Sequence, residues 1–76
     1  METYKVYFNG RRQGAIGIFY HTHDTVDAEN PKHAVRALHK QYDFGINSQG
    51  IKVLEFCKAQ DCFVDVCTVD IGEIYN

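Results

Sequence analysis

The segment His21-Thr22-His23-Asp24 holds the side chains whose types and spacing most directly suggest chemistry. On a strand, imidazoles at positions i and i+2 point to the same side and can chelate one metal ion. His-x-His-x-Asp-His is a metal pattern of hydrolases, but here Thr25 and Val26 follow, so the pattern is incomplete. Because two exposed strand histidines are the ordinary alternative, we expect no metal site here.

The three cysteines follow one another at five-residue intervals, as Cys57, Cys62 and Cys67. Structural zinc sites prefer gaps of about two to four residues, and secreted disulfide-rich domains carry an even number of cysteines. The hairpin register predicted below also places Cys57 and Cys67 on opposite faces. We therefore expect free thiols in a reducing compartment, acting as small apolar fillers, with Cys62 at a turn the most exposed.

A cysteine nucleophile with a histidine base is the remaining catalytic possibility. The sequence supplies no third orienting group, and 76 residues leave little room for a cleft that excludes water. Gly10, Gly14 and Gly17 do not lead from a strand into a helix, so they do not form a phosphate-binding loop. We expect a protein without enzymatic activity and without a cofactor.

The length predicts a single domain over residues 1–76 with a thin core, because a chain this short buries only roughly 60% of its unfolded surface. Apolar residues make up 45% of the chain and charged residues 24%, which is typical of a globular protein. No apolar run approaches the roughly 20 residues that cross a bilayer, and the polar start does not predict a signal peptide.

Charge is distributed unevenly along the chain. Residues 1–58 hold eight basic and six acidic residues, a balance of +2, whereas residues 59–76 hold four acidic residues and no basic one. The net charge of −2 argues against a dedicated nucleic-acid binder. The asymmetry predicts a bipolar molecule that is steered toward a charged protein partner.

Hydrophobic alternation predicts an α+β fold, an antiparallel sheet of about four strands with one helix packed on one face, in the order β-β-α-β-β. Strands are expected over residues 3–8, 15–28, 51–58 and 62–70, with a tail over residues 71–76. Asn9-Gly10 predicts a tight turn that continues into a basic loop over residues 11–14. In the second strand, the even positions are expected to face the core and the odd positions to face away; the even positions are Ile16, Ile18, Tyr20, Val26 and Ala28, and the odd ones are Phe19, His21, His23, Thr25 and Asp27.

The helix has the clearest signals. Asn30 is suited to cap its first backbone N–H groups, Pro31 is suited to its first position, and Gly45 is expected to end it. Ala34, Val35, Leu38 and Tyr42 follow at helical spacing and predict the buried stripe. The opposite side is cationic, with Lys32, His33, Arg36, His39 and Lys40.

The last two strands predict a hairpin that is apolar on both faces. With Gln60-Asp61 as a two-residue turn, Leu54 and Phe56 share a face with Phe63, Cys67 and Val69. Ile51, Val53 and Cys57 then share the other face with Val64 and Val66. One helix cannot cover both faces, and the surplus predicts an interface with a partner or with a second copy through the sheet.

The order of elements and the segment Thr25 to Leu38 (TVDAENPKHAVRAL), with Tyr4-Lys5-Val6 before it and Ile51-Lys52-Val53 after it, resemble small phage-encoded proteins. Two groups are similar: the T7-type inhibitor of host RNA polymerase, and small anti-CRISPR proteins that block type I surveillance complexes. The resemblance covers roughly residues 3–58, lies in pattern and size, and transfers no functional residue. It implies a viral protein of the host cytoplasm that blocks a bacterial defence complex or RNA polymerase by occupying a functional surface.

We expect the partner to be a bacterial protein complex, with no membrane involved. The candidate binding residues are two arginines at the hairpin tip, three residues of the exposed sheet face and three helix cations: Arg11, Arg12, Phe19, His21, His23, Lys32, Arg36 and Lys40. The alternative is a small phage regulator that binds nucleic acid directly. It would stack bases on exposed Tyr7 and Phe19 and pair these cations with phosphates.

Overall fold

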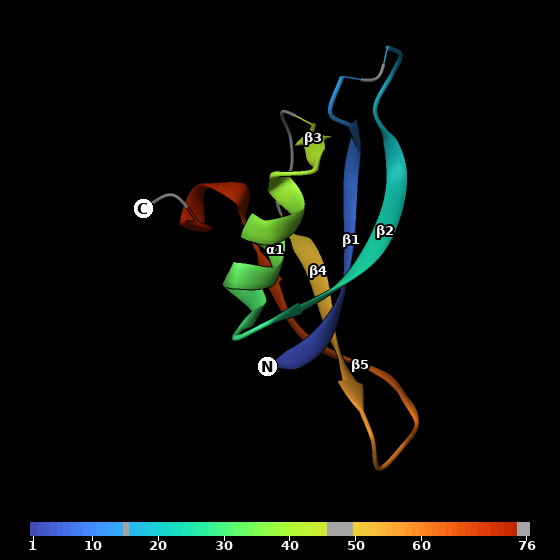
Figure 1. The fold of residues 1–76 in the computed structure, drawn as a ribbon, viewed down its shortest axis with the longest axis vertical. Coiled ribbons are helices and arrows are strands. Elements are labelled where there is room, and N and C mark those ends of the chain that lie inside the picture. Colours follow the sequence, from blue (N-terminus) through green and yellow to red (C-terminus); the bar gives the residue numbers. More distant parts are fainter. Residues whose placement is uncertain (15, 46–49, 75–76) are drawn as a thin grey trace.

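The computed structural model, which describes residues 1–14, 16–45 and 50–74, shows an antiparallel sheet with one helix on one face, which confirms the predicted α+β class (Figure 1). The elements are β1 (Glu2–Arg12), β2 (Tyr20–Ala28), α1 (Pro31–His39), β3 (Tyr42–Phe44), β4 (Ile51–Cys57), β5 (Cys62–Val69) and the 3₁₀ helix η1 (Ile71–Ile74). The sheet has five strands, where about four were expected. Its order is β2-β1-β4-β5, and the short β3 also pairs with β1.

The long strand β1 organises the sheet. One of its edges pairs with β2 over nearly its whole length, from Glu2 opposite Ala28 to Gly10 opposite Tyr20. Its other edge pairs first with β4, through residues 4–7, and then with β3, through residues 10–12. Because three strands bind β1, the alternation of its side chains sets which residues face the helix and which face away.

The core lies between α1 and the face of the sheet formed by the even positions of β1. Tyr4, Val6 and Phe8 of β1 are buried there with Ile51 and Val53 of β4. The helix contributes its predicted stripe, and Ala28, Tyr42 and Val69 complete the core; the buried helix residues are Ala34, Val35 and Leu38. We call this side of the sheet the inner face.

The helix begins as predicted and ends earlier than predicted. The Asn30 side-chain oxygen accepts a hydrogen bond from the His33 backbone N–H at 2.9 Å, and Pro31 occupies the first helical position. The helix stops at His39, so Gly45 is not its cap. The predicted stripe residue Tyr42 is buried in β3, where pairing with β1 satisfies backbone groups that a longer helix would have bonded internally.

Two further predictions about the first hairpin were wrong. Asn9 and Gly10 are strand residues, and β1 continues to Arg12, because β3 binds the second edge of this stretch. The return strand β2 starts at Tyr20, so Ile16 and Ile18 lie exposed in the connecting loop and Tyr20 is also exposed; Ala15 lies outside the described residues. Val26 and Ala28 do face the core, as predicted.

The β4–β5 hairpin differs from prediction because of a β-bulge. Cys57 pairs with Cys62, which leaves a four-residue loop, and the register shifts between Val53 and Leu54. Phe56 and Phe63 share a face, as predicted. The shift turns Cys67 to the inner face, opposite Val53, and Val69 is buried there as well.

The predicted tail begins with η1, and its Ile71 packs against the core. Residues 75–76 lie outside the described residues. Within the described part of the chain, no helix is long and apolar enough to cross a membrane.

The contact between β1 and β3 requires glycine at position 10. A Cβ added to Gly10 would lie 2.6 Å from the Asp43 carbonyl oxygen and 3.1 Å from ring atoms of Phe8. We predict that Gly10→Ala lowers the free energy of unfolding by about 1–3 kcal/mol, measured by urea denaturation. Gly72→Ala is the control, because a Cβ there meets nothing within 4 Å and its expected effect is below about 0.5 kcal/mol. Equal midpoints for the two variants would contradict this reading of the β1–β3 contact.

Two buried tyrosines predict a loss of stability at high pH. Burial, followed by the nearby Glu55 carboxylate, raises the pKa of Tyr4 above 10.0; burial, followed by the hydrogen bond from the Tyr42 hydroxyl to Asp24 at 2.9 Å, raises the pKa of Tyr42. The folded state therefore holds these protons more tightly than the unfolded chain. The stability that these two protonated tyrosines contribute is fully present below about pH 10, and it is lost as the pH rises through their raised pKa values.

We predict that the free energy of unfolding falls as the pH rises above roughly 10, and that the fall is shallower for Tyr42→Phe. Denaturation midpoints across this range, with tyrosinate absorbance of the folded protein, measure both effects. The explanation fails if stability does not change across this range, or if Tyr42→Phe leaves the fall as steep as in the wild-type protein.

Candidate interaction surface

The side of the sheet opposite α1 carries aromatic and apolar side chains together with two lysines and two histidines. We call this side of the sheet the outer face; its residues are Lys5 and Tyr7 of β1, His21 and His23 of β2, Lys52, Leu54 and Phe56 of β4, and Phe63 of β5. All of these residues are exposed or half-buried. Figure 1 shows why, since α1 and η1 both lie on the other side of the sheet.

Lys5 occupies the middle of the outer face. Its ammonium lies 5.8 Å from the centre of the Tyr7 ring and 5.3 Å from that of the Phe63 ring. Among the described residues, no carboxylate forms an ion pair with it. The two rings hold the lysine chain against the sheet, so its charge stays in an apolar surround at the centre of the face.

Aromatic pairs flank Lys5 on two sides. Tyr7 lies opposite His23, and their ring centres are 5.1 Å apart. Phe56 lies opposite Phe63 in an edge-to-face arrangement at 5.4 Å. Both pairs are cross-strand neighbours, which fixes their positions through the backbone ladder.

The two histidines of the sequence motif lie on the outer face, exposed, as the odd–even alternation predicted. His21 pairs with Asn9 and His23 with Tyr7 across the ladder. Asp24 lies on the inner face, where its carboxylate accepts a hydrogen bond from the Tyr42 hydroxyl. Within the described residues, no three His, Cys, Asp or Glu side chains are grouped so that they could hold a metal ion.

The arginines at the hairpin tip have different environments. Arg11 is half-buried: its Nε lies 3.6 Å from an Asp43 carboxylate oxygen, its guanidinium carbon lies 4.8 Å from the centre of the Phe19 ring, and it donates to the Gly17 carbonyl. Arg12 is exposed and lies over the Tyr42 ring at 5.4 Å. Arg11 and Phe19 thus hold the loop together, instead of extending into solvent as a recognition element.

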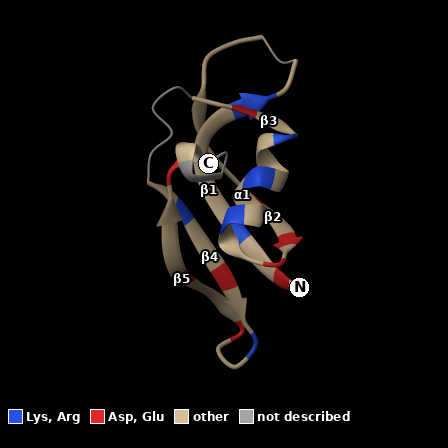
Figure 2. Cartoon of the chain, turned by 90° about the vertical axis from the view of Figure 1, so that its left-hand side faces the viewer, with Lys and Arg blue, Asp and Glu red and all other residues tan. Residues whose placement is uncertain are grey.

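The helix cations form a separate surface. Lys32 and Arg36 are exposed on α1, and Lys40 is exposed directly after its last residue, as its C-cap. Figure 2 shows the basic bands of the helix on the side opposite the outer face. The predicted candidate residues therefore do not form one site. His21 and His23 belong to the outer face, Arg11, Arg12 and Phe19 to the hairpin tip, and the other cations to the helix.

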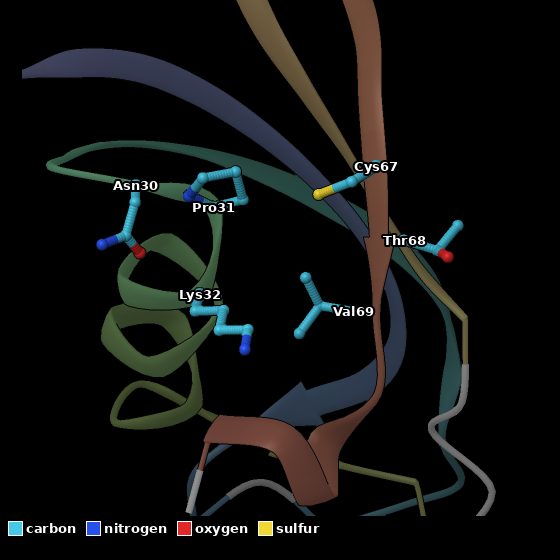
Figure 3. A pocket seen from close by; sticks show the side chains of 6 residues that line it. All are labelled: Asn30, Pro31, Lys32, Cys67, Thr68 and Val69. Atoms are coloured by element: carbon cyan, nitrogen blue, oxygen red, sulfur yellow. The ribbon is translucent and has the colours of Figure 1, made fainter.

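A pocket of about 390 Å³ lies between the start of α1 and the end of β5 (Figure 3). Its lining is Asn30, Pro31, Lys32, Cys67, Thr68 and Val69, which includes no histidine and no carboxylate. Cys62 is exposed, as predicted. Cys67 is also exposed and Cys57 is half-buried, so the prediction that these two cysteines are buried fillers was wrong. The bulge and the distance of the hairpin end from the helix account for this exposure.

Two of the four acidic residues at the end of the sequence have partners within the fold. Asp65 reaches Lys52 on the outer face, with 3.4 Å between its Oδ1 and the lysine Nζ. Asp70 accepts the Gly50 backbone N–H at 2.7 Å. The ion pair of Asp65 with Lys52 thus offsets one positive charge on the outer face.

Sequence reasoning did not name Lys5, Lys52, Phe56 or Phe63 among the candidate binding residues, although it predicted an interface from the two apolar faces of the β4–β5 hairpin. Two signals would have found them. The strict alternation of residues 3–8 puts Lys5 and Tyr7 on the face away from Val6, and the hairpin pairing puts Phe63 beside Phe56.

Comparison with known proteins found no match: no family model, no curated protein and no solved structure matches this chain.

The environments of the two arginines predict that the same substitution destabilises the protein at position 11 and has almost no effect at position 12. Arg11→Gln removes the ion pair with Asp43 and the contact with Phe19, and we expect it to lower the free energy of unfolding by about 1–2 kcal/mol. Arg12→Gln removes one exposed ring contact, and we expect a change below about 0.5 kcal/mol. Urea denaturation of the two variants checks this, and equal losses would contradict the structural role of Arg11.

Proposed function

We propose that this protein is a non-enzymatic binding protein, and that its outer face holds a protein subunit of a bacterial nucleic-acid machine. Binding blocks the machine by occupying a functional surface, in a one-to-one complex and without chemistry. The observation that carries this proposal is the continuous row formed by Tyr7, Leu54, Phe56 and Phe63 around Lys5, which no element in the described part of the chain covers.

The composition of the outer face fits a protein partner. Aromatic residues are enriched at the centres of protein interfaces, where they supply large contact areas for little loss of side-chain freedom. The Lys5 ammonium is the natural contact for a partner carboxylate, because burying it in the interface without an opposite charge is costly. We therefore expect an apolar partner surface with one acidic side chain opposite Lys5.

A second copy of this chain suits the outer face less well. In a two-fold interface centred on this face, Lys5 would approach Lys5 of the partner copy. Two ammonium groups without a carboxylate between them repel each other. The charge at the centre of the face thus favours a different protein over a homodimer.

The class of the target comes from the resemblance of residues 3–58 to small phage-encoded inhibitors. Such proteins act in the host cytoplasm on RNA polymerase or on CRISPR surveillance complexes. An inhibitor that works without a catalytic site needs a surface that binds its target, and the outer face can serve as that surface. The small size of the protein, 76 residues, also suits an inhibitor that covers one functional surface of a large machine.

Direct binding of single-stranded nucleic acid is the second candidate function. Tyr7, His23 and Phe63 are rings on an open sheet with Lys5 and Lys52 beside them, an arrangement that can stack bases and pair phosphates. Two observations favour the protein partner. Lys5 already lies against the Tyr7 and Phe63 rings, and Lys52 is paired with Asp65, which leaves the face close to neutral.

Charge reversal at three places separates the candidate surfaces. We predict that Lys5→Glu weakens binding to immobilised bacterial RNA polymerase or type I surveillance complex at least about tenfold, which corresponds to about 1.4 kcal/mol. The matched controls are Lys40→Glu on the helix and Arg12→Glu at the hairpin tip, which change the charge equally and should alter the affinity less than about twofold. Biolayer interferometry measures the dissociation constants, and circular dichroism checks the folding of each variant.

Gel shifts with single-stranded DNA and RNA at several salt concentrations test the second candidate. The protein-partner proposal predicts no shift at low salt. A shift that weakens steeply with salt and is lost in Lys5→Glu would support nucleic-acid binding instead. Capture of a machine with unchanged affinity for Lys5→Glu would show that the outer face is not the interface.

A further inference from the structure

Two cysteines lie opposite each other at the loop end of the β4–β5 hairpin. Cys57 and Cys62 are directly opposite in the ladder and are its last pair before the loop. The loop between them closes with a hydrogen bond from the Gln60 N–H to the Cys57 carbonyl at 3.2 Å, and Asp61 adopts a positive φ of 52°. Figure 1 shows this end of the hairpin extending well beyond the helix.

The backbone places these two residues within bonding range. Directly opposite residues of an antiparallel pair have Cα atoms about 4.5–5.5 Å apart and side chains on the same face. Disulfides span Cα separations of roughly 4.4–6.8 Å. A bond between Cys57 and Cys62 therefore needs a change of side-chain rotamers but no rearrangement of the strands.

Cys67 is too far away to compete for either partner. It lies opposite Val53, four residues along β4 from Cys57, or about 13 Å at the rise of a strand. It lies five residues along β5 from Cys62, or about 16 Å before any shortening by the bulge. Its sulfur points into the pocket beside Pro31 (Figure 3). The fold thus selects one pair out of the three cysteines.

We propose that Cys57 and Cys62 form a dithiol–disulfide exchange site that a low-molecular-weight disulfide such as glutathione disulfide oxidises. Cys62 is the more exposed of the two thiols, and it donates to the Gln60 amide oxygen, with 3.8 Å between Sγ and Oε1. Its thiolate attacks one sulfur of glutathione disulfide, forms a mixed disulfide and releases one glutathione thiolate.

The second step closes the loop. The Cys57 thiolate attacks the Cys62 sulfur of the mixed disulfide, the new Sγ–Sγ bond forms, and the second glutathione leaves as its thiolate. The two protons lost by the cysteines are taken up by the two glutathione thiolates. Two cysteine thiols are thus oxidised by two electrons, and one glutathione disulfide is reduced to two glutathione molecules.

The site is separate from the outer face. Cys57 shares a strand face with Val53, which is buried under the helix, whereas Phe56 and Phe63 point to the other side. The disulfide ties the ends of a four-residue loop that the ladder already holds together. We therefore expect oxidation to leave the outer face in place and to change the overall stability only slightly.

The test is disulfide mapping in glutathione buffers that range from reduced to oxidised. Wild-type protein and Cys67→Ser are equilibrated, quenched with an alkylating reagent, and analysed by mass spectrometry of peptides without reduction. The expected product has lost one pair of hydrogens, carries a Cys57–Cys62 link in both proteins, and returns to the dithiol with dithiothreitol. Cys57→Ser should stop at the mixed disulfide on Cys62.

Three results would overturn the proposal. They are stable glutathione adducts on wild-type Cys62 with no loop disulfide, a disulfide that involves Cys67, and only intermolecular disulfides under the oxidised condition. Because the wild-type protein alone distinguishes these outcomes, the test holds even if Cys57→Ser is poorly folded. Its outcome is also independent of whether Lys5→Glu affects partner binding.

Discussion

The structure depends on one constraint: a single short helix must cover a sheet that is much longer than itself. The nine residues of α1 extend about 14 Å, whereas the eleven residues of β1 extend about 37 Å. The helix therefore buries only the middle of the inner face. Three parts of the molecule stay in contact with solvent: the outer face, the hairpin tip with Ile16 and Ile18, and the loop end of the β4–β5 hairpin. The exposure of the hairpin tip and of the two cysteines next to the β4–β5 loop results from this mismatch in length, whereas the outer face is exposed because α1 and η1 both lie on the other side of the sheet.

The helix and the central strand could be predicted well because their signals are local. Asn30 and Pro31 specify the start of α1, and the spacing of Ala34, Val35 and Leu38 specifies its buried side. Alternation in residues 3–8 likewise specified which side of β1 faces the core. These features depend on propensity and periodicity within a few residues, which sequence alone contains.

The errors occurred where distant residues decide the structure. Asn9-Gly10 has the composition of a turn, but β3 pairs with Gly10 and Arg11 and keeps them in the strand. The bulge after Val53 turned Cys67 to the inner face, and no local signal marks it. The same difference between local and distant signals explains why the sequence predicted only part of the candidate site. His21 and His23 follow from alternation, whereas the contacts of Lys5 with Phe63 join strands almost sixty residues apart in sequence and depend on the sheet order.

Protection of individual lysines in the complex tests the central claim most directly. The complex formed with the captured machine is treated with a lysine-methylating reagent, and the modification of each lysine is compared with that in the unbound protein by mass spectrometry. If the outer face is the interface, Lys5 and Lys52 become protected while Lys40 on the helix keeps its reactivity. Undiminished reactivity of Lys5 together with protection of Lys40 would contradict the account and place the interface on the helix.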